Sequence, residues 1–287
     1  MAEGGSPLVQ RRRLRAELKK ARQASGLTQD QVAVEMDWSL SKIIRIESAS
    51  SGISANDLKA LLQLYGVKDS AQVDSLVALA RAARERSWWS AYRDVAPQPL
   101  LQLTEYESAA QAIRQFETMF VPGILQTEDY ARAVIDNYYE EGLSSNQLHA
   151  LVELRTRRQD VIDAENPPSF HFILDEAAVH RLVVGSSVMR RQLRRLIEVA
   201  NKPNITLEVI PFSAGLHPGM KGPFEIIEFA DPSDSDIVYL ESPRGDIFSD
   251  IPEETSKYRE DFARLGKASL GPQGSLARIA KIADKMA

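Results

Sequence analysis

Cysteine is missing from all 287 residues of the sequence. Its absence excludes disulfide bonds, zinc sites built on thiolates, and redox switching through thiols. No apolar stretch approaches the roughly 20 residues that a membrane-spanning helix needs, and the N-terminus lacks the charged and then apolar pattern of a secretory signal peptide. We therefore expect a cytoplasmic protein. Its 44% hydrophobic and 26% charged residues are ordinary for a globular chain that can hold two domains.

The usual sequence signatures of catalysis are absent as well. There is no Gly-x-Gly-x-x-Gly, no Walker-type Gly-Lys-Ser/Thr, no Gly-x-Ser-x-Gly and no His-Glu-x-x-His. The histidines, at 149, 171, 180 and 217, have no metal-ligand spacing. Paired carboxylates such as Asp175-Glu176 are common on surfaces and fall here at the ends of elements. We predict no enzymatic activity, no cofactor and no metal; a hydrolase without a recognisable motif is the competing class.

Charge is distributed unevenly along the chain. The formal net charge of −5 argues by itself against nucleic acid as a partner. Residues 11–66, however, hold ten Lys and Arg against six Asp and Glu, so this segment is +4 and the remainder −9. Opposite charges indicate different tasks for the two parts. The first basic side chains either neutralise DNA phosphates or form a solvated helix face; they are Arg11, Arg12, Arg13, Arg15, Lys19, Lys20 and Arg22.

Residues 26–47 have the pattern of two short helices joined by a tight turn. Thr28 is placed to cap the first helix, with Gln31 three residues on in the capping-box position. Ser39 is placed to cap the second helix, in which Ile43 and Ile46 point inward. The opposite side of that helix carries Leu40, Ser41, Ile44, Arg45 and Ser48. The pattern predicts a DNA-reading helix-turn-helix with this side in the major groove; a helical hairpin without a nucleic-acid role is the alternative.

Two motifs in this stretch are similar to those of a known family. A Leu-Thr-Gln opening stands at residues 27–29 and an Ile-x-Arg-Ile-Glu ending at residues 43–47, and together they resemble the Cro/repressor-like (XRE) helix-turn-helix family. The resemblance implies that Gln29 contacts a phosphate and braces the recognition helix. It also implies that Ser41 and Arg45 read bases.

The same resemblance implies roles for the neighbouring residues. Ser39 and Lys42 would lie near phosphates. Leu40 and Ile44 depart from the family, whose members usually carry small or polar residues there; they would either contact thymine methyl groups or lower the affinity.

A small helical module is expected to occupy the N-terminal part of the chain. Ser54 is placed to cap a further helix that ends at Gly66. We predict a five-helix DNA-binding domain over residues 9–68, preceded by a flexible tail of residues 1–8. Residues 69–100 continue at helical spacing to a break at two prolines and are expected to form a helical connector.

Aromatic residues are concentrated in this connector. Trp88 and Trp89 are adjacent, and Tyr92 follows shortly after. They indicate core packing between the connector and the second domain, an interface, or a ligand slot.

Residues 101–287 are expected to start with helices and then to change period. Helices are predicted around 103–119, 128–141 and 146–164. Strands are predicted at 170–174, 205–210, 224–229 and 237–241, and later helices at 187–200, 252–265 and 275–286, the last capped by Ser275. The predicted fold class is therefore multidomain: an all-α N-terminal domain, and an α+β C-terminal domain with a small sheet of about four strands surrounded by helices.

The helix predicted over 146–164 is rich in arginine. Arg155, Arg157 and Arg158 stand close to Glu153 and Asp160 in the sequence. This spacing favours a salt-bridged surface over a second nucleic-acid patch.

A turn at Pro122-Gly123 leads into the acidic start of the helix predicted at 128–141. Thr127 is placed to bond the free backbone donors of this helix. Either the turn is a fold-defining corner, or Gln126 and Tyr130 contact a ligand or partner.

The longest recognisable motif lies around this turn. It stands as Val121-Pro122-Gly123-Ile124-Leu125-Gln126-Thr127-Glu128-Asp129-Tyr130-Ala131-Arg132. Further pieces are Arg86-Ser87-Trp88-Trp89, Glu107 with Ala110, Arg155 with Arg158-Gln159, Leu174-Asp175-Glu176-Ala177-Ala178, Gln192-Leu193 and Ile210-Pro211-Phe212. In this order they resemble the effector region of Scr1-family, antitoxin-like transcriptional regulators of the actinobacterial type, over roughly residues 10–285.

The resemblance implies a regulator that acts with a small protein encoded by an adjacent gene. We predict a homodimer that presents two recognition helices to an inverted-repeat operator in double-stranded DNA, because one module covers too little groove for tight specific binding. The second domain would supply dimer contacts and receive the partner or a small-molecule ligand. The alternative is an antitoxin-like protein that chiefly sequesters its small neighbour and binds DNA only for autoregulation.

Overall fold

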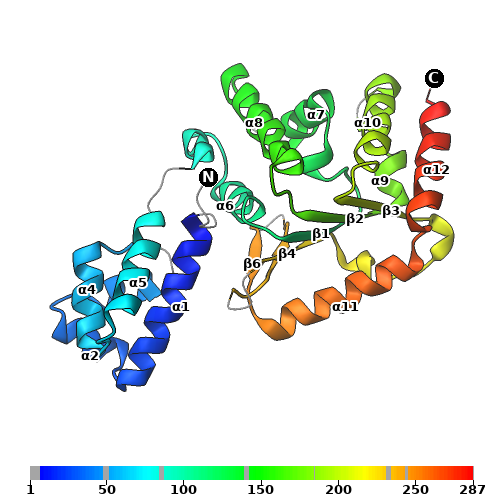
Figure 1. Ribbon diagram of the computed structural model, residues 1–287. Helices are drawn as coiled ribbons and strands as arrows, with labels where there is room; N and C mark the ends of the chain where they lie inside the picture. Colours follow the sequence, from blue (N-terminus) through cyan, green and yellow to red (C-terminus); the bar gives the residue numbers. More distant parts are fainter. Residues whose placement is uncertain are drawn as a thin grey trace. The chain divides into compact units, whose positions relative to one another are not determined.

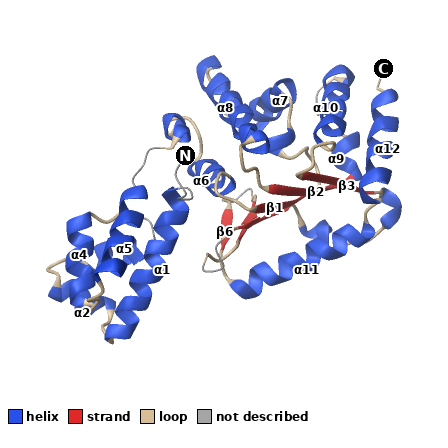
Figure 2. Cartoon of the chain, in the orientation of Figure 1, coloured by secondary structure: helices blue, strands red, loops and turns tan. Residues whose placement is uncertain are grey.

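A computed structural model describes residues 7–47, 52–83, 87–138, 142–183, 185–230, 234–242 and 245–286. Ser48, the segment 84–86 and most of the predicted N-terminal tail lie outside the described residues. The chain divides into two compact units, Met1–Ser90 and Ala91–Ala287. The first is helical and the second is built on a sheet with helices (Figure 2).

The described residues of the N-terminal unit form five α-helices around one core. They are α1 (Pro7–Ser25), α2 (Gln29–Glu35), α3 (Leu40–Glu47), α4 (Ala55–Leu64) and α5 (Ser70–Ala82), and the 3-10 helix η1 (Trp88–Tyr92) follows. Leu18, Val32, Ile43 and Leu58 are buried at its centre, as their helical spacing predicts. Helix α5 falls in the segment expected to connect the domains, and its Leu76 belongs to this same core.

The expected caps of the short helices are formed. Thr28 and Gln31 make a complete capping box on α2, and the Ser39 hydroxyl accepts from the Lys42 backbone N–H at 3.2 Å. Ser54 accepts from the Asp57 N–H on α4. Each cap satisfies a backbone donor that the first turn leaves unpaired, so short helices are held at defined starts.

The C-terminal unit contains a six-stranded mixed sheet in the order β3-β2-β1-β4-β5-β6. Its strands are β1 (Ala112–Glu117), β2 (Ser169–Asp175), β3 (Ile205–Ile210), β4 (Phe224–Glu228), β5 (Ile237–Leu240) and β6 (Ile247–Ser249). Strands β1, β2 and β3 are parallel, whereas β4, β5 and β6 pair antiparallel. The α+β class is confirmed, with six strands among the described residues where about four were predicted.

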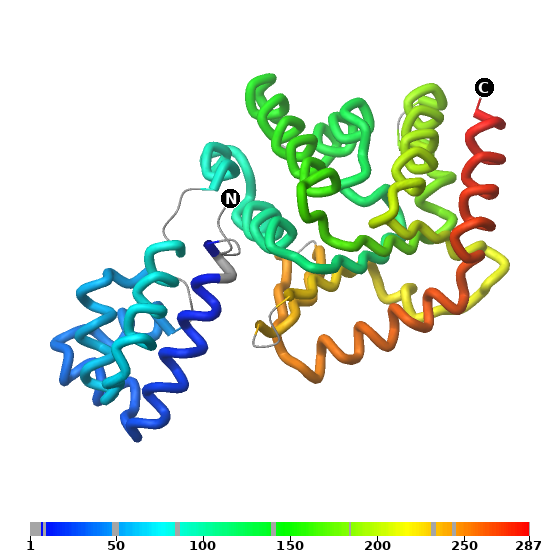
Figure 3. Tube along the Cα trace, in the orientation of Figure 1, coloured from blue at the N-terminus to red at the C-terminus, as the bar shows by residue number. Residues whose placement is uncertain are grey.

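Helices cover both faces of this sheet (Figure 1). They are α6 (Gln98–Glu107), α7 (Glu128–Tyr138), α8 (Ser145–Arg158), α9 (Glu176–His180), α10 (Ser186–Val199), α11 (Pro252–Ala268) and α12 (Gly271–Asp284). Helices α7, α9, α10 and α12 share one large core with the strands, and α11 packs on the opposite face. The tube view shows α12 returning beside α10 (Figure 3), so the apolar stripe predicted for the last helix is used within the chain.

The largest difference from the sequence prediction is strand β1. Residues 103–119 were predicted as one helix, but α6 ends at Glu107 and residues 112–117 form a central strand. Ile113 and Phe116, three residues apart, mimic helical spacing. In the strand they point to opposite faces and enter two different cores.

Three smaller predictions are corrected. Ser275 does not cap α12, which starts at Gly271; its hydroxyl is buried and accepts from the Val209 N–H at 2.7 Å. The Thr127 hydroxyl is buried and makes no hydrogen bond in the described part of the chain. The helix expected to reach residue 164 ends at Arg158 and continues as a 3-10 turn, η3 (Gln159–Asp163).

Candidate functional sites

The exposed face of α3 carries the residues predicted to read bases. Ile43 and Ile46 are buried, which leaves Ser41 and Arg45 exposed together with half-exposed Leu40 and Ile44. A polar hydroxyl and a guanidinium one helical turn apart can both reach base edges in a major groove. The two exposed apolar side chains are suited to thymine methyl groups.

A polar cluster fixes α3 in place. The Arg22 guanidinium makes two hydrogen bonds to the Glu47 carboxylate, at 2.6 and 3.1 Å, and the Gln29 amide donates to Glu47 at 2.7 Å. Arg22 also donates to the Leu27 carbonyl at 2.9 Å. The cluster joins α1, the start of α2 and the end of α3. Gln29 is therefore positioned to brace the recognition helix, and its phosphate contact stays a prediction.

Lys42 is held by two neighbours on the same unit. Its ammonium lies 3.5 Å from the centre of the Trp38 ring and 3.3 Å from an Asp57 carboxylate oxygen. Both contacts are partly exposed, so they hold the ammonium only weakly against a competing phosphate.

The predicted aromatic cluster is largely buried. Trp89 and Tyr92 are buried and Trp88 is half-buried. The two indole rings meet edge to face, with centroids 5.5 Å apart. The burial of Trp89 and Tyr92 argues against an open ligand slot at these side chains.

The turn at residues 121–127 is held by side chains from distant parts of the sequence. Gln126 donates to the Val121 carbonyl and accepts from Arg155, at 2.8 and 3.0 Å. Gln192 accepts from the Thr127 N–H at 2.6 Å and donates to the Leu125 carbonyl at 2.8 Å. The Tyr130 hydroxyl accepts from the Val121 N–H, and this ring is wholly buried. These bonds favour the fold-defining corner.

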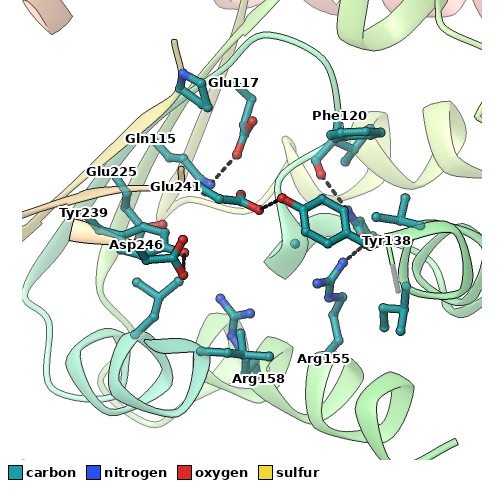
Figure 4. A pocket seen from close by; sticks show the side chains of 18 of the residues that line it. Gln115, Glu117, Phe120, Tyr138, Arg155, Arg158, Glu225, Tyr239, Glu241 and Asp246 are labelled. Carbon is teal, nitrogen blue, oxygen red and sulfur yellow. Dashed lines mark hydrogen bonds between the residues drawn. The ribbon is translucent and has the colours of Figure 1, made fainter. Parts of the chain in front are cut away.

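A cavity of about 280 Å³ lies in the C-terminal unit, and Gln126 is one of the residues that line it. The sheet supplies one wall, and helices α6, α7 and α8 supply the others (Figure 4). Because β4 runs antiparallel to β1 and to β5, the carboxyl ends of β1 and β5 meet the start of β4 at this wall. Polar side chains at alternate positions of these strands therefore converge; they are Gln115, Glu117, Glu225, Tyr239 and Glu241.

The cavity wall contains carboxyl groups with perturbed titration. Burial, assisted by Glu241, raises the pKa of Glu117 to about 8. Burial, assisted by Glu107, raises the pKa of Glu225 well above its ordinary value. One Glu225 carboxylate oxygen is buried and has no hydrogen-bond partner among the described residues. Neutral acids in a cavity are a common sign of a functional site.

The arginines of α8 differ from the salt-bridged surface that the sequence predicted. Arg158 does not belong to a salt-bridged surface, because it is buried and bonds Glu107 of α6 through two contacts of 2.9 and 2.6 Å. Arg155 is half-buried and lines the cavity. Arg157 alone of the three is exposed. Whether an arginine of α8 is buried or exposed therefore depends on the elements that pack against its turn of the helix.

The Asp175-Glu176 pair also departs from the surface expectation. Glu176 is buried and accepts from Arg278 at 2.9 Å and from the Phe212 N–H at 2.8 Å. Asp175 caps α9 and lies 3.3 Å from His217. Both carboxylates therefore stabilise local structure. The described part of the chain contains no group of three potential metal ligands.

Sequence reasoning missed the cavity residues Glu117, Glu225 and Tyr239. The available signal was the presence of polar residues inside the otherwise apolar segments 112–117 and 224–228. It is weak, because each strand is short and neither segment alternates regularly between polar and apolar residues.

Comparison with known proteins divides the chain in the same way. Residues 13–76 match a family described as Helix-turn-helix domain. Residues 100–281 match the family described as Domain of unknown function (DUF5753). No curated protein and no solved structure matches the chain.

The helix-turn-helix match supports a DNA-binding regulator, a class that is typically not enzymatic. Among the helices of the described segments, none has the length and apolar character to cross a membrane.

Proposed function

Because this chain belongs to the DUF5753 family and carries a helix-turn-helix domain, we propose that it is a sequence-specific transcriptional regulator that reads its operator with α3. The observation that carries the proposal is the exposed face of α3, on which Ser41 and Arg45 stand over a buried apolar side. The brace through Glu47 fixes the direction of this face, and preorganisation of this kind lowers the entropic cost of binding.

The proposed assembly is a homodimer on an inverted repeat. One recognition helix contacts only a few base pairs, and two helices spaced by about 34 Å read two half-sites on one side of the duplex. Sedimentation of the free protein and of its operator complex tests this: a complex with two chains per operator is expected, and one chain per operator contradicts it.

Arg45→Ala is expected to weaken binding to the cognate operator by about 1–3 kcal/mol, the loss of one base contact. Binding to unrelated DNA should fall less. The measurement is competition binding on the DNA upstream of the chain's own operon at two salt concentrations. Arg81→Ala, which removes an exposed arginine from α5, is the charge-matched control. An equal loss on both DNAs would show that Arg45 contacts phosphate only.

Lys42→Ala should act differently, because a phosphate contact carries no sequence information. Affinity should fall on cognate and unrelated DNA alike, and the slope of log K against log salt should become shallower by about 1. An unchanged slope would mean that Lys42 keeps its contacts with Trp38 and Asp57 in the complex.

A second candidate function is the antitoxin-like one, in which the chain chiefly sequesters a small protein from a neighbouring gene. It is favoured by exposed apolar side chains in the loop between β3 and β4, where Phe212, Leu216 and Met220 are 62%, 92% and 59% exposed. Apolar groups exposed in this way are typical of interaction surfaces. The resemblance to Scr1-family regulators supports the same partner.

The two functions are separated in cells with the Arg45→Ala chain. Loss of the biological effect makes DNA reading the primary role. A retained effect with derepression of the operon makes sequestration primary and DNA binding autoregulatory.

A further inference from the structure

The cavity of the C-terminal unit has a floor and a rim of different exposure. Glu225, on β4, is 2% exposed, whereas Tyr138 and Glu241 are exposed. The Tyr138 hydroxyl donates to Glu241 at 2.9 Å, and Figure 4 shows Tyr138 across the cavity from Glu225, with Glu241 between them. Solvent therefore reaches the cavity on the side of Tyr138 and Glu241.

Glu225 lies in the middle of a row across the sheet. Its Cα neighbours on the two adjoining strands are Gln115 and Tyr239, so all three side chains stand on the cavity face. The Tyr239 hydroxyl donates to Asp246 at 2.9 Å and the Gln115 amide to Glu117 at 2.9 Å. Neither group donates to Glu225, and one oxygen of this carboxyl is buried without a partner in the described residues.

The charges around the cavity do not balance. Four carboxylates line it, Glu117, Glu225, Glu241 and Asp246, against two arginines. Arg158 is already neutralised by two contacts with Glu107. Arg155, on the opposite wall in Figure 4, bonds Gln126. Within the described part of the chain, the cavity is therefore lined by more acidic side chains than basic ones.

Aromatic and apolar groups fill the rest of the wall. Phe120, Phe224, Tyr138 and Tyr239 line the cavity together with leucine and valine side chains. Aromatic faces attract cations and exclude water from them. The described residues contain no cluster of three potential metal ligands, so an organic cation suits this wall better than a metal ion.

We propose that this cavity binds a small organic cation, an amine or guanidine, whose positive charge is received by Glu225 and Glu117 between the aromatic side chains. The volume of about 280 Å³ is many times the roughly 10–15 Å³ that a cavity needs to hold one water molecule. The cavity is therefore large enough for a small organic amine. The site lies wholly within the C-terminal unit, and it does not depend on DNA reading by α3.

Binding of such a cation releases protons. The protonated forms of both carboxyls are favoured in the empty cavity, because burial raises the pKa of Glu117 to about 8 and that of Glu225 well above its ordinary value. A bound ammonium group favours their charged forms and lowers both pKa values. The other titratable groups that face them are Glu241, Asp246 and Tyr239 from the sheet side, Tyr138 from α7, Glu107 from α6, and Arg155 and Arg158 from α8.

The test is calorimetric titration of the full chain with three amines, namely tyramine, agmatine and putrescine. Two comparison compounds keep the phenol ring and the two-carbon chain of tyramine: neutral 4-ethylphenol and anionic 4-hydroxyphenylacetate. We expect saturable binding of at least one amine, no binding of the neutral or anionic compound, and proton release near pH 7 seen as a dependence of the heat on the buffer. Failure of all three amines to bind, or equal binding of the matched neutral compound, would overturn the proposal.

Glu225→Gln tests the floor of the cavity with a side chain of the same shape. The amine affinity should fall at least tenfold and the proton release should decrease. Glu165→Gln, at an exposed glutamate that does not line the cavity, should change neither. Unchanged affinity in folded Glu225→Gln protein would overturn the assignment. If that variant does not fold, Glu117→Gln and the matched compounds on the wild-type chain decide the question. DNA binding is measured separately, so failure of either proposal is seen independently.

Discussion

Glu117 and Glu225 are carboxyl groups whose pKa is raised by burial in the fold. Glu117 ends β1, and burial raises its pKa from an ordinary 4.5 to about 8. Because a raised pKa means that the folded chain binds a proton more tightly than the unfolded chain, this proton stabilises the fold fully below pH 4.5. Its contribution is lost as the pH rises through about 8.

We therefore expect the free energy of unfolding of the C-terminal unit to fall between pH 5 and about 9, and Glu117→Gln to make this fall shallower. The measurement is urea denaturation at several pH values. Glu165→Gln, at an exposed glutamate, should leave the pH dependence as in the wild type. A variant that loses stability with pH as steeply as the wild type would mean that Glu117 titrates normally in the folded chain.

The turn between α2 and α3 is a defined helix ending. The Trp38 N–H donates to the Ala33 carbonyl at 2.9 Å and the Asp37 N–H to Val34 at 3.1 Å, which is the Schellman pattern. Asp37 occupies its left-handed position with φ 52°. Gly66 has the same place after α4, with φ 76°. Aspartate tolerates this conformation better than most residues, yet glycine adopts it without strain.

Asp37→Gly should consequently stabilise the N-terminal unit, by up to about 1 kcal/mol, because the left-handed strain is removed. Gly66→Ala should destabilise it by about 1 kcal/mol; a Cβ there would meet no atom within 4 Å, so only backbone strain is introduced. Thermal unfolding followed by circular dichroism measures both. Equal signs for the two substitutions would contradict the conformational explanation.

Helix α8 shows how one element serves several neighbours. Arg155 contacts Gln126 in the corner motif, and Arg158, three residues on, is buried against Glu107. Gln159, just past the helix, donates to the Gln126 carbonyl at 2.6 Å. One end of α8 thereby ties the corner at residues 121–127 to α6 and forms a wall of the cavity. A ligand in the cavity would contact the same end.

The two units have separate cores, and each core contains a buried ion pair. Arg22 and Glu47 are 13% and 5% exposed in the N-terminal unit, and Arg158 and Glu107 are 5% and 4% exposed in the C-terminal one. Removing one partner leaves a poorly solvated charge without compensation, which costs about 3–5 kcal/mol for a fully buried pair.

Calorimetry of the whole chain should therefore resolve two transitions. Glu47→Ala should lower the free energy of unfolding of the N-terminal unit by about 3 kcal/mol. Glu107→Ala should lower that of the C-terminal unit by about 3–5 kcal/mol. The double variant should show both losses, additive within about 0.5 kcal/mol, because the sites share no partner. One transition that responds to both substitutions would mean that the units unfold together.

The helix-turn-helix follows from local patterns in the sequence. Thr28 with Gln31, Ser39, and the inward Ile43 and Ile46 specify short-range contacts within about eight residues, and all of them are formed. Strands 205–210 and 237–240 were found for the same reason, because apolar runs bounded by turns are local signals. In these elements the spacing of apolar residues along the sequence already shows which side chains share the buried face.

The cavity and strand β1 depend on neighbours that are far apart in the sequence. Ile113 and Phe116 are buried in cores on opposite faces of the sheet. The polar side chains of Gln115 and Glu117 fit into the sheet because α6, α7 and α8 leave a cavity over that part of it. Glu225 meets Gln115 across 110 residues of chain only because β4 pairs with β1. Periodicity carries no information about strand order or about which helix covers which strand, so the raised pKa values of Glu117 and Glu225 and the pairing of Arg158 emerge only when the whole unit is folded.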